Sequence, residues 1–286
     1  MKRKKVLITG GNSKIGTDLV KFFLKKNQVV STYRNKKIKL KNRNLKQVRY
    51  EFKNKFLLNE KFDYFIHCAS STPVNSKINR KMLEENLKGL KNILCSKSHF
   101  TSIVLISTVS VYGDISNNFI DENTKHTKLN YYGLSKLKME NYLKKIPKIN
   151  YLILRLPGVI GNYKNKDNFI NKIIFNISKN KSVVVHGPDT FFNNIVHTET
   201  IAKIINNFFI RGFPKRQVFN LCSKKPMRIK NLVLLIKKKL KSKSMITFKP
   251  GLKNSFCISE KKCAKQKVKL ENTNITIKKT LAFLSK

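Results

Sequence analysis

Tryptophan is absent from this chain of 286 residues, and acidic residues are scarce: 15 Asp and Glu stand against 61 Lys and Arg. No apolar run approaches the roughly 18 residues of a membrane-spanning helix, so we expect no membrane insertion. The N-terminal stretch MKRKKVLITGG has only four apolar residues between its basic cluster and a turn, too few for the core of a signal peptide. These absences favour a globular protein of the cytoplasm.

Cysteine is infrequent, and its spacing excludes two kinds of site. The cysteines are odd in number, widely separated and never form a CxxC pair; they are Cys68, Cys95, Cys222, Cys257 and Cys263. A disulfide scaffold and a zinc site are therefore both disfavoured, and we expect reduced thiols and no bound metal.

The formal net charge of +46 is spread over many lysine-rich segments rather than one tail. Such a surface attracts nucleic acids, anionic membranes and small anions without specificity. No basic helix has the spacing of base-reading side chains, and no RNA-binding signature occurs. We therefore favour drift towards residues with A- and T-rich codons over a dedicated nucleic-acid partner, and we keep a basic RNA-binding protein as a competing hypothesis.

Short β-rich segments alternate with amphipathic helical segments through the first half of the chain. We expect strands at 5–10, 28–33, 46–52, 63–70, 102–108 and 150–156. This alternation predicts an α/β fold of the Rossmann type, in which a doubly wound parallel sheet has helices on both faces. We expect a dinucleotide-binding domain with the catalytic residues at 1–161. A smaller C-terminal α/β lobe at 162–286, interleaved with the first domain, should mainly bind substrate.

The stretch VLITGGNSKIG, residues 6–16, places Gly10, Ser13 and Gly16 where a dinucleotide-binding turn has three glycines. The first glycine permits the turn, the second lets a pyrophosphate approach the backbone, and the third lets the helix pack on the strand. Only the second is replaced, and a serine hydroxyl can bond a phosphate oxygen. We therefore expect cofactor contacts from Gly10, Asn12, Ser13, Ile15 and Gly16. No Gly-Lys-Ser/Thr triplet follows, which excludes a P-loop.

The second expected strand ends in STYRN, and this ending bears on the choice of cofactor. Folds that select NAD usually place an acidic residue here for the ribose 2′-hydroxyl, whereas an arginine accommodates the 2′-phosphate of NADP. Tyr33 occupies the acidic position and Arg34 follows it. We expect NADP, with NAD as the alternative.

The stretch NYYGLSK places Tyr132 and Lys136 one helical turn apart, on one face of a predicted helix. An ammonium beside a phenol lowers the phenol pKa, which gives a general acid/base for a carbinol oxygen. Tyr131 has Ser135 at the matching distance and does not qualify. Thr108 lies 24 residues before Tyr132, at the end of a predicted strand, where its hydroxyl can hold the same substrate oxygen.

Together these motifs resemble the extended short-chain dehydrogenases/reductases, specifically the NAD(P)-dependent sugar-nucleotide epimerase/dehydratase family. The resemblance covers nearly the whole chain and includes DYFIHCAS, ENLKGLKNIL with Asn86, STVSVYG, LRLPGVIG, NNIVHTE and VFNLCSKKP. It implies that Thr108, Tyr132 and Lys136 are catalytic and that Ala69 lines the cofactor. It also implies substrate contacts from Ser110, Asn193 and His197, a nucleotide-sugar substrate and a place in polysaccharide biosynthesis, and it allows a homodimer.

Departures from the family pattern narrow the reaction. Dehydratases of the family resemble one another in carrying acidic residues just after the catalytic threonine, where this chain has Val109 and Ser110. Enzymes that epimerise C3 and C5 have a cysteine at the position of Ser110. Both reactions are disfavoured. Asn193 replaces an arginine that in many relatives pairs with the substrate diphosphate, so another cation binds it or the substrate is not a nucleotide sugar.

Two reactions remain open, both hydride transfers at one carbon. We rank net reduction of a keto sugar by NADPH ahead of 4-epimerisation, on the NADP preference and the compact chain. A regulator that binds cofactor without turnover is the hypothesis from another class. Three catalytic side chains in matching positions argue against it, because simple binding does not need them.

Overall fold

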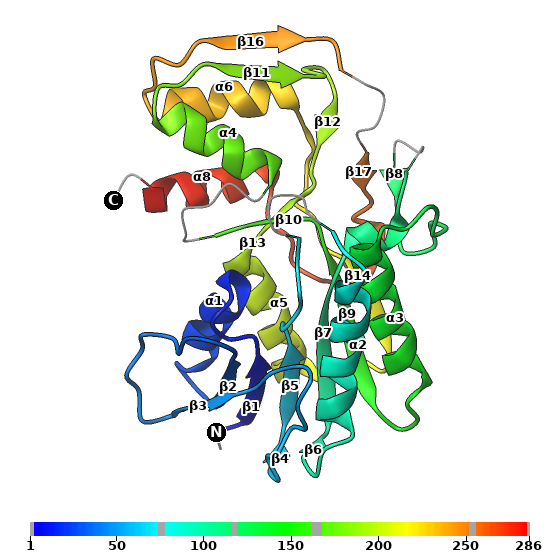
Figure 1. Cartoon of the computed structure of the whole chain (residues 1–286). Coiled ribbons are helices and arrows are strands. Elements are labelled where there is room, and N and C mark those ends of the chain that lie inside the picture. The colour runs from blue at the N-terminus through cyan, green and yellow to red at the C-terminus, as the bar shows by residue number, and fades with distance from the viewer. Residues whose placement is uncertain (1–2, 74–77, 116–118, 162–167, 252–255, 285–286) are drawn as a thin grey trace. The chain divides into compact units, whose positions relative to one another are not determined.

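The computed structural model describes residues 3–73, 78–115, 119–161, 168–251 and 256–284. The chain forms two compact units (Figure 1). The first comprises residues 1–113, 126–155 and 202–219, and the second comprises 114–125, 156–201 and 220–286. The two units interleave along the chain, because residues 114–125 belong to the second unit and residues 202–219 return to the first.

A seven-stranded parallel sheet forms the centre of the first unit, and it confirms the expected fold class. Its strand order is β14-β9-β7-β5-β1-β2-β3. The bounds are β1 Lys5–Thr9, β2 Gln28–Tyr33, β3 Leu45–Arg49, β5 Tyr64–His67, β7 Ser102–Thr108, β9 Asn150–Leu156 and β14 Gln217–Asn220. The strand order reverses direction at β1, and in such sheets ligands bind beyond the carboxyl ends of the strands at this switch point.

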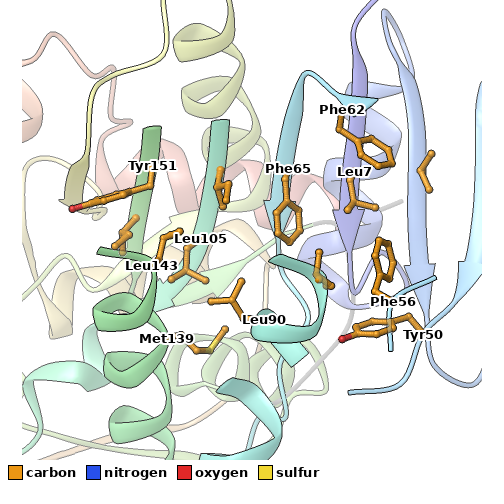
Figure 2. Close-up of a cluster of buried hydrophobic side chains, with 14 residues drawn as sticks. Leu7, Tyr50, Phe56, Phe62, Phe65, Leu90, Leu105, Met139, Leu143 and Tyr151 are labelled. Atoms are coloured by element: carbon orange, nitrogen blue, oxygen red, sulfur yellow. The ribbon is translucent and has the colours of Figure 1, made fainter. Parts of the chain in front are cut away.

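Helices cover both faces of this sheet (Figure 1). Successive strand residues point to opposite faces. Tyr64 of β5 stacks on Phe209 of α5, with ring centroids 3.5 Å apart. The next residue, Phe65, packs in a cluster with Leu90 of α2 and Met139 of α3 (Figure 2). The bounds are α1 Lys14–Phe23, α2 Lys81–Leu94, α3 Tyr131–Lys145 and α5 Thr198–Arg211.

Short elements complete the first unit at the two ends of the sheet. A two-stranded parallel pair, β4 Lys61–Phe62 and β6 His99–Phe100, lies before β5 and β7 in the chain. The turn η1, Val109–Tyr112, follows β7 directly. Amphipathic spacing explains the helices: α1 buries Gly16, Leu19, Val20 and Phe23, which recur at helical intervals.

The second unit is a smaller α/β assembly with its own core, in which Ile173, Ile177, Val185 and Ile236 are buried together. Its helices are α4 Phe169–Ser178, α6 Ile229–Lys239, α7 Lys261–Lys265 and α8 Thr273–Leu284. Its strands pair two by two: β10 Gly158–Ile160 with β13 Ile195–His197, β11 Val183–His186 with β16 Ile246–Lys249, β12 Phe191–Phe192 with β15 Met227–Arg228, and β8 Phe119–Ile120 with β17 Cys257–Ile258.

One strand lies in a different sheet from the one we expected. The segment QVFNLCS, residues 217–223, falls within the smaller lobe expected at 162–286, but its strand β14 pairs with β9 at the edge of the central sheet. A strand pattern shows that a segment is extended and not which sheet it joins. Among the described residues, no helix is both long and apolar enough to cross a membrane.

Candidate active site

Backbone crowding where β1 meets α1 explains two of the glycines. Gly10 has a φ of +63°, and a Cβ on it would lie 2.8 Å from the Cα of Ala69. A Cβ on Gly16 would lie 2.1 Å from the carbonyl oxygen of Gly10. Both neighbours are backbone atoms that cannot rotate away, so glycine is required at each position. The turn therefore presents the first backbone N–H groups of α1 as a phosphate cradle requires.

Ser13 is the N-cap of α1, and its hydroxyl accepts a hydrogen bond from the Gly16 amide at 3.0 Å. The hydroxyl hydrogen can still donate to a phosphate oxygen, so capping and the predicted cofactor contact are compatible. Sequence reasoning missed Gly11. A Cβ there would lie 1.8 Å from Oγ of Ser31, so the chain has a close backbone approach one residue after Gly10. The Gly-Gly doublet was the available signal.

A hollow of about 480 Å³ lies beside the turn, lined by Asn12, Thr17, Asn35, Lys36, Lys37, Ile38 and Lys39. Of these described residues none is acidic, and three are lysines. Tyr33 ends β2 just before this segment, and the exposed Arg34 follows it. The charge at the end of β2 is therefore positive, which suits a phosphate better than a neutral ribose hydroxyl.

The predicted catalytic side chains come together in the first unit. Thr108 ends β7, and its hydroxyl lies close enough to Tyr132, in the first turn of α3, to offset part of the rise that burial causes in the pKa of that phenol. α3 begins there because Asn130 caps it, accepting from the Gly133 amide at 2.9 Å. A Cβ on Gly133 would lie 2.2 Å from the carbonyl oxygen of Ser110. The glycine after Tyr132 thus lets the helix approach the turn that follows Thr108.

Lys136 lies one turn further along α3 and is buried. Its ammonium donates to the carbonyl oxygen of Ile106 at 3.0 Å. Burial lowers the pKa of Lys136 to about 8, while Cys68 and Glu140 oppose that shift. The Lys136 charge also acts on the end of β5. Burial lowers the pKa of His67 and Lys136 adds to that shift, whereas burial raises the pKa of Cys68 and Lys136 partly offsets the rise. Lys136 therefore lies at the carboxyl edge shared by β5 and β7.

The expected effect of Lys136 on the phenol is not present in this structure. Burial raises the pKa of Tyr132 to about 12, and the hydrogen bond with Thr108 only partly offsets this. We expected a lowered pKa from the ammonium, but the ammonium is bonded to Ile106. At neutral pH the phenol therefore carries its proton and is poised as a general acid.

His67 is a buried residue at the end of β5. Its ring is fully buried, and Nδ1 is hydrogen-bonded to the hydroxyl of Thr9 at 2.9 Å. Burial lowers its pKa to about 3, with Lys136 adding to the shift, so the imidazole is neutral. Among the described residues, no three His, Cys, Asp or Glu side chains gather so as to hold a metal ion.

The other predicted residues lie close to the trio or in the second unit. Ser110 Oγ accepts a hydrogen bond from Thr108 Oγ1 at 3.2 Å. Asn193 is buried, and its amide donates to and accepts from the backbone of Ile258 at 2.8 and 2.9 Å. His197 is buried and accepts from the Glu199 amide at 3.1 Å. Substrate contacts by Asn193 and His197 stay predictions.

Comparison with known families agrees with this geometry. The model of the NAD dependent epimerase/dehydratase family matches residues 6–221, from β1 to just beyond β14. The chain belongs to this family. Membership of the NAD dependent epimerase/dehydratase family confirms the resemblance inferred from the motifs. The family name covers more than one reaction, so membership establishes the enzyme class and leaves the reaction open.

Relatives of this family member are mainly epimerases by name. ADP-L-glycero-D-manno-heptose-6-epimerase of Brachyspira hyodysenteriae is 22% identical over 88% of this chain and 86% of that protein. N-acetyl-alpha-D-glucosaminyl-diphospho-ditrans,octacis-undecaprenol 4-epimerase of Escherichia coli O157:H7 is 27% identical over 60% of this chain and 54% of that protein. The structure of UDP-N-acetylglucosamine 4-epimerase from Methanobrevibacter ruminantium M1 has a TM-score of 0.84 at 21% identity, covering 100% and 99% of the two chains.

Proposed function

We propose that this member of the epimerase/dehydratase family is a nucleotide-sugar 4-epimerase. The proposal rests on one observation: Thr108, Tyr132 and Lys136 lie near one another at the edge of the sheet where the glycine turn also lies. The names of two of the relatives support 4-epimerisation ahead of the net reduction that the sequence ranked first. Reduction remains the second candidate, supported by the positive charge at the end of β2.

The residues at the turn fit a nicotinamide dinucleotide. Side chains at Gly10 and Gly16 are excluded by backbone atoms, which leaves room for a diphosphate at the N-terminus of α1. When bound, the cofactor accepts a hydride from a carbinol carbon and returns it. We propose that Gly10, Asn12, Ser13, Ile15, Gly16 and Ala69 hold it, with Lys136 at the nicotinamide ribose.

The chain itself handles the proton. Tyr132 must first lose its own proton; in its ionised form it takes the proton of the C4 hydroxyl and later returns it, and Thr108 holds the same oxygen in position. Lys136 stabilises the ionised phenol in the proposed reaction when its ammonium turns from the Ile106 carbonyl towards Tyr132. A cofactor held at the glycine turn that took a hydride from C4 and gave it back would allow inversion of that carbon with no net consumption.

Elimination of water needs an acid/base that this site lacks at the expected place. Val109 and Ser110 follow Thr108, and neither side chain exchanges protons with carbon at neutral pH. We therefore propose that the enzyme is not a 4,6-dehydratase. A cytoplasmic location, a homodimer and a place in polysaccharide biosynthesis remain proposals from the sequence.

A screen of sugar diphosphates tests the proposal. Purified protein is incubated with UDP-sugars and with a polyprenyl-diphosphate sugar, with and without added NADPH, and the products are identified by NMR. We expect two C4 epimers to interconvert without added cofactor. Conversion that consumes one NADPH per product would establish the reductase instead.

Replacement of Arg34 tests the cofactor preference. We expect Arg34→Ala to weaken NADPH binding by about 10- to 100-fold, the scale of one or two lost charged hydrogen bonds, and NADH binding much less. Dissociation constants from fluorescence titration measure both. Arg43→Ala is the matched control, because Arg43 is exposed in the same unit and does not line the hollow. Equal losses of NADPH and NADH affinity would show that Arg34 contributes surface charge alone.

A further inference from the structure

Glu140 has a carboxylate with no exposed area in the middle of α3. Arg155 of β9 donates to both of its oxygens, from Nε to Oε1 at 3.1 Å and from Nη2 to Oε2 at 2.7 Å. Ser107 of β7 donates its hydroxyl hydrogen to Oε1 at 2.6 Å. Lys144 Nζ lies 3.7 Å from Oε2. One carboxylate therefore joins a helix to two adjacent strands of the central sheet.

Arg155 extends this network to the far side of Thr108. Its Nη1 donates to the hydroxyl of Tyr112 at 2.7 Å, and its guanidinium lies 5.0 Å from the centre of the Tyr112 ring. Tyr112 ends the η1 turn that follows Thr108. The network therefore holds Ser107 immediately before Thr108 and Tyr112 four residues after it.

Cohesion between α3 and the sheet does not require a buried charge. Met139 and Leu143 of α3 already pack with Leu105 of β7 in the hydrophobic cluster (Figure 2). A buried ion pair loses hydration on both partners, and apolar side chains of similar volume often stabilise a fold equally well. The Glu140 network adds hydrogen bonds, which have preferred lengths and angles and therefore fix the position of the carboxyl end of β7.

We infer that Glu140 is a positioning residue: its bonds to Ser107 and, through Arg155, to Tyr112 hold Thr108 in register with Tyr132 and Lys136. Glu140 lies four residues after Lys136 and eight after Tyr132, so the three share one face of α3. The inference rests on the proposed function only for the catalytic role of the trio. The bonds that define the network stand without it.

Glu140 also contributes charge next to Lys136. The titratable groups around Lys136 are Glu140 on its own helix and His67 and Cys68 at the end of β5. His67 is neutral because its pKa is about 3, and the Cys68 thiol is neutral because burial raises its pKa to about 12. Against the larger lowering caused by burial, coulombic attraction by Glu140 raises the pKa of Lys136. Its removal should lower the pKa of Lys136 further, so the ammonium would be lost at a lower pH.

Two variants separate the effect of the hydrogen bonds around Glu140 from the effect of its charge. Ser107→Ala removes one hydroxyl and keeps the ion pair, whereas Glu140→Gln keeps the side-chain volume and removes the charge. Glu60→Gln is the matched control. Glu60 is a partly buried carboxylate of the same unit, with 20% of its side chain exposed, and it pairs with Lys5 and Lys46 at 2.7 Å. Lys5 begins β1 at the end remote from the glycine turn.

We expect kcat to fall about 10- to 100-fold in Ser107→Ala and Glu140→Gln, the scale of a catalytic group displaced by about 1 Å. KM should change little. The alkaline limb of the kcat profile should move to lower pH in Glu140→Gln and stay in place in Ser107→Ala. Glu60→Gln should retain both the wild-type kcat and the wild-type limb.

Hydrogen exchange of residues 105–113, measured by mass spectrometry without substrate, gives a second readout. Exchange should be faster in both variants and unchanged in the control, since the Ser110 amide donates to Thr108 Oγ1. If the wild-type protein converts no sugar, the proposed function has failed. The hydrogen-exchange measurement then tests by itself whether Glu140 positions Thr108. If Glu140→Gln does not fold, Ser107→Ala decides. The inference would be overturned if Ser107→Ala kept the kcat and the exchange rates of the wild-type protein. It would also be overturned if Glu140→Gln and Glu60→Gln had equal effects.

Discussion

Replacement of Tyr132 by phenylalanine is expected to lower turnover by about 10²-fold or more while cofactor binding is retained. The change removes a single oxygen, the phenolic oxygen, whose pKa burial raises and the nearby Thr108 hydroxyl partly lowers. The glycine turn and Lys136 are unaltered, so the cofactor contacts proposed for them remain. Steady-state kinetics with the sugar found in the screen and a fluorescence titration of NADPH measure the two quantities.

The neighbouring tyrosine provides a matched control. Tyr131 is 45% exposed on the same turn of α3, so Tyr131→Phe removes the same atom from a side chain that faces solvent. We expect wild-type turnover from Tyr131→Phe. If Tyr132→Phe also retains wild-type turnover, Tyr132 has no part in the chemistry and the proposed mechanism is wrong.

The second large effect is expected from Gly16→Ala. The new Cβ would lie 2.1 Å from the carbonyl oxygen of Gly10 and 2.8 Å from the Cα of Gly11, and relief requires the turn to open. Overpacking of this kind costs about 1–3 kcal/mol, so affinity for NAD(P)H should fall about 10- to 100-fold. Circular dichroism shows whether the fold persists while fluorescence titration gives the affinity.

Gly212→Ala is the control that distinguishes an effect on the glycine turn from the general cost of adding a methyl group to a glycine. Gly212 has a φ of +106°, so alanine is strained there, but its Cβ would meet no atom within 4 Å. This variant should lose some stability and keep the wild-type affinity for cofactor. An affinity of Gly16→Ala within twofold of wild type, given titration error of about that size, would remove the turn from the binding site.

Much of the first unit was predictable because its signals are local. Strand segments are short apolar runs, and helices such as α1 bury residues at helical intervals, so composition and periodicity indicated the alternation. The places of Thr108 at a strand end and of Tyr132 and Lys136 at a helix start were predictable for the same reason, because each lies in a short motif, and their catalytic role stays a prediction. The sheet that β14 joins was not, because edge pairing depends on contacts far away in the sequence.

The electrostatics of the site were the least predictable feature. Spacing places Lys136 one turn from Tyr132, but it does not show that the ammonium is bonded to the Ile106 carbonyl. Burial then raises the pKa of Tyr132, opposite to the expectation. Glu140 gave no signal either, since an acidic residue four positions after a lysine usually marks an exposed pair. Its burial between β7 and β9 is a tertiary property.

A sugar diphosphate deuterated at C4 tests the central claim most directly. The purified protein is incubated with this substrate in ordinary water, without added cofactor, and the C4 epimer is examined by NMR and mass spectrometry. The account predicts that the product retains deuterium at C4, because the hydride leaves and returns without exchange with solvent. Protium at C4 of the product would show proton abstraction from carbon by a base and contradict the account.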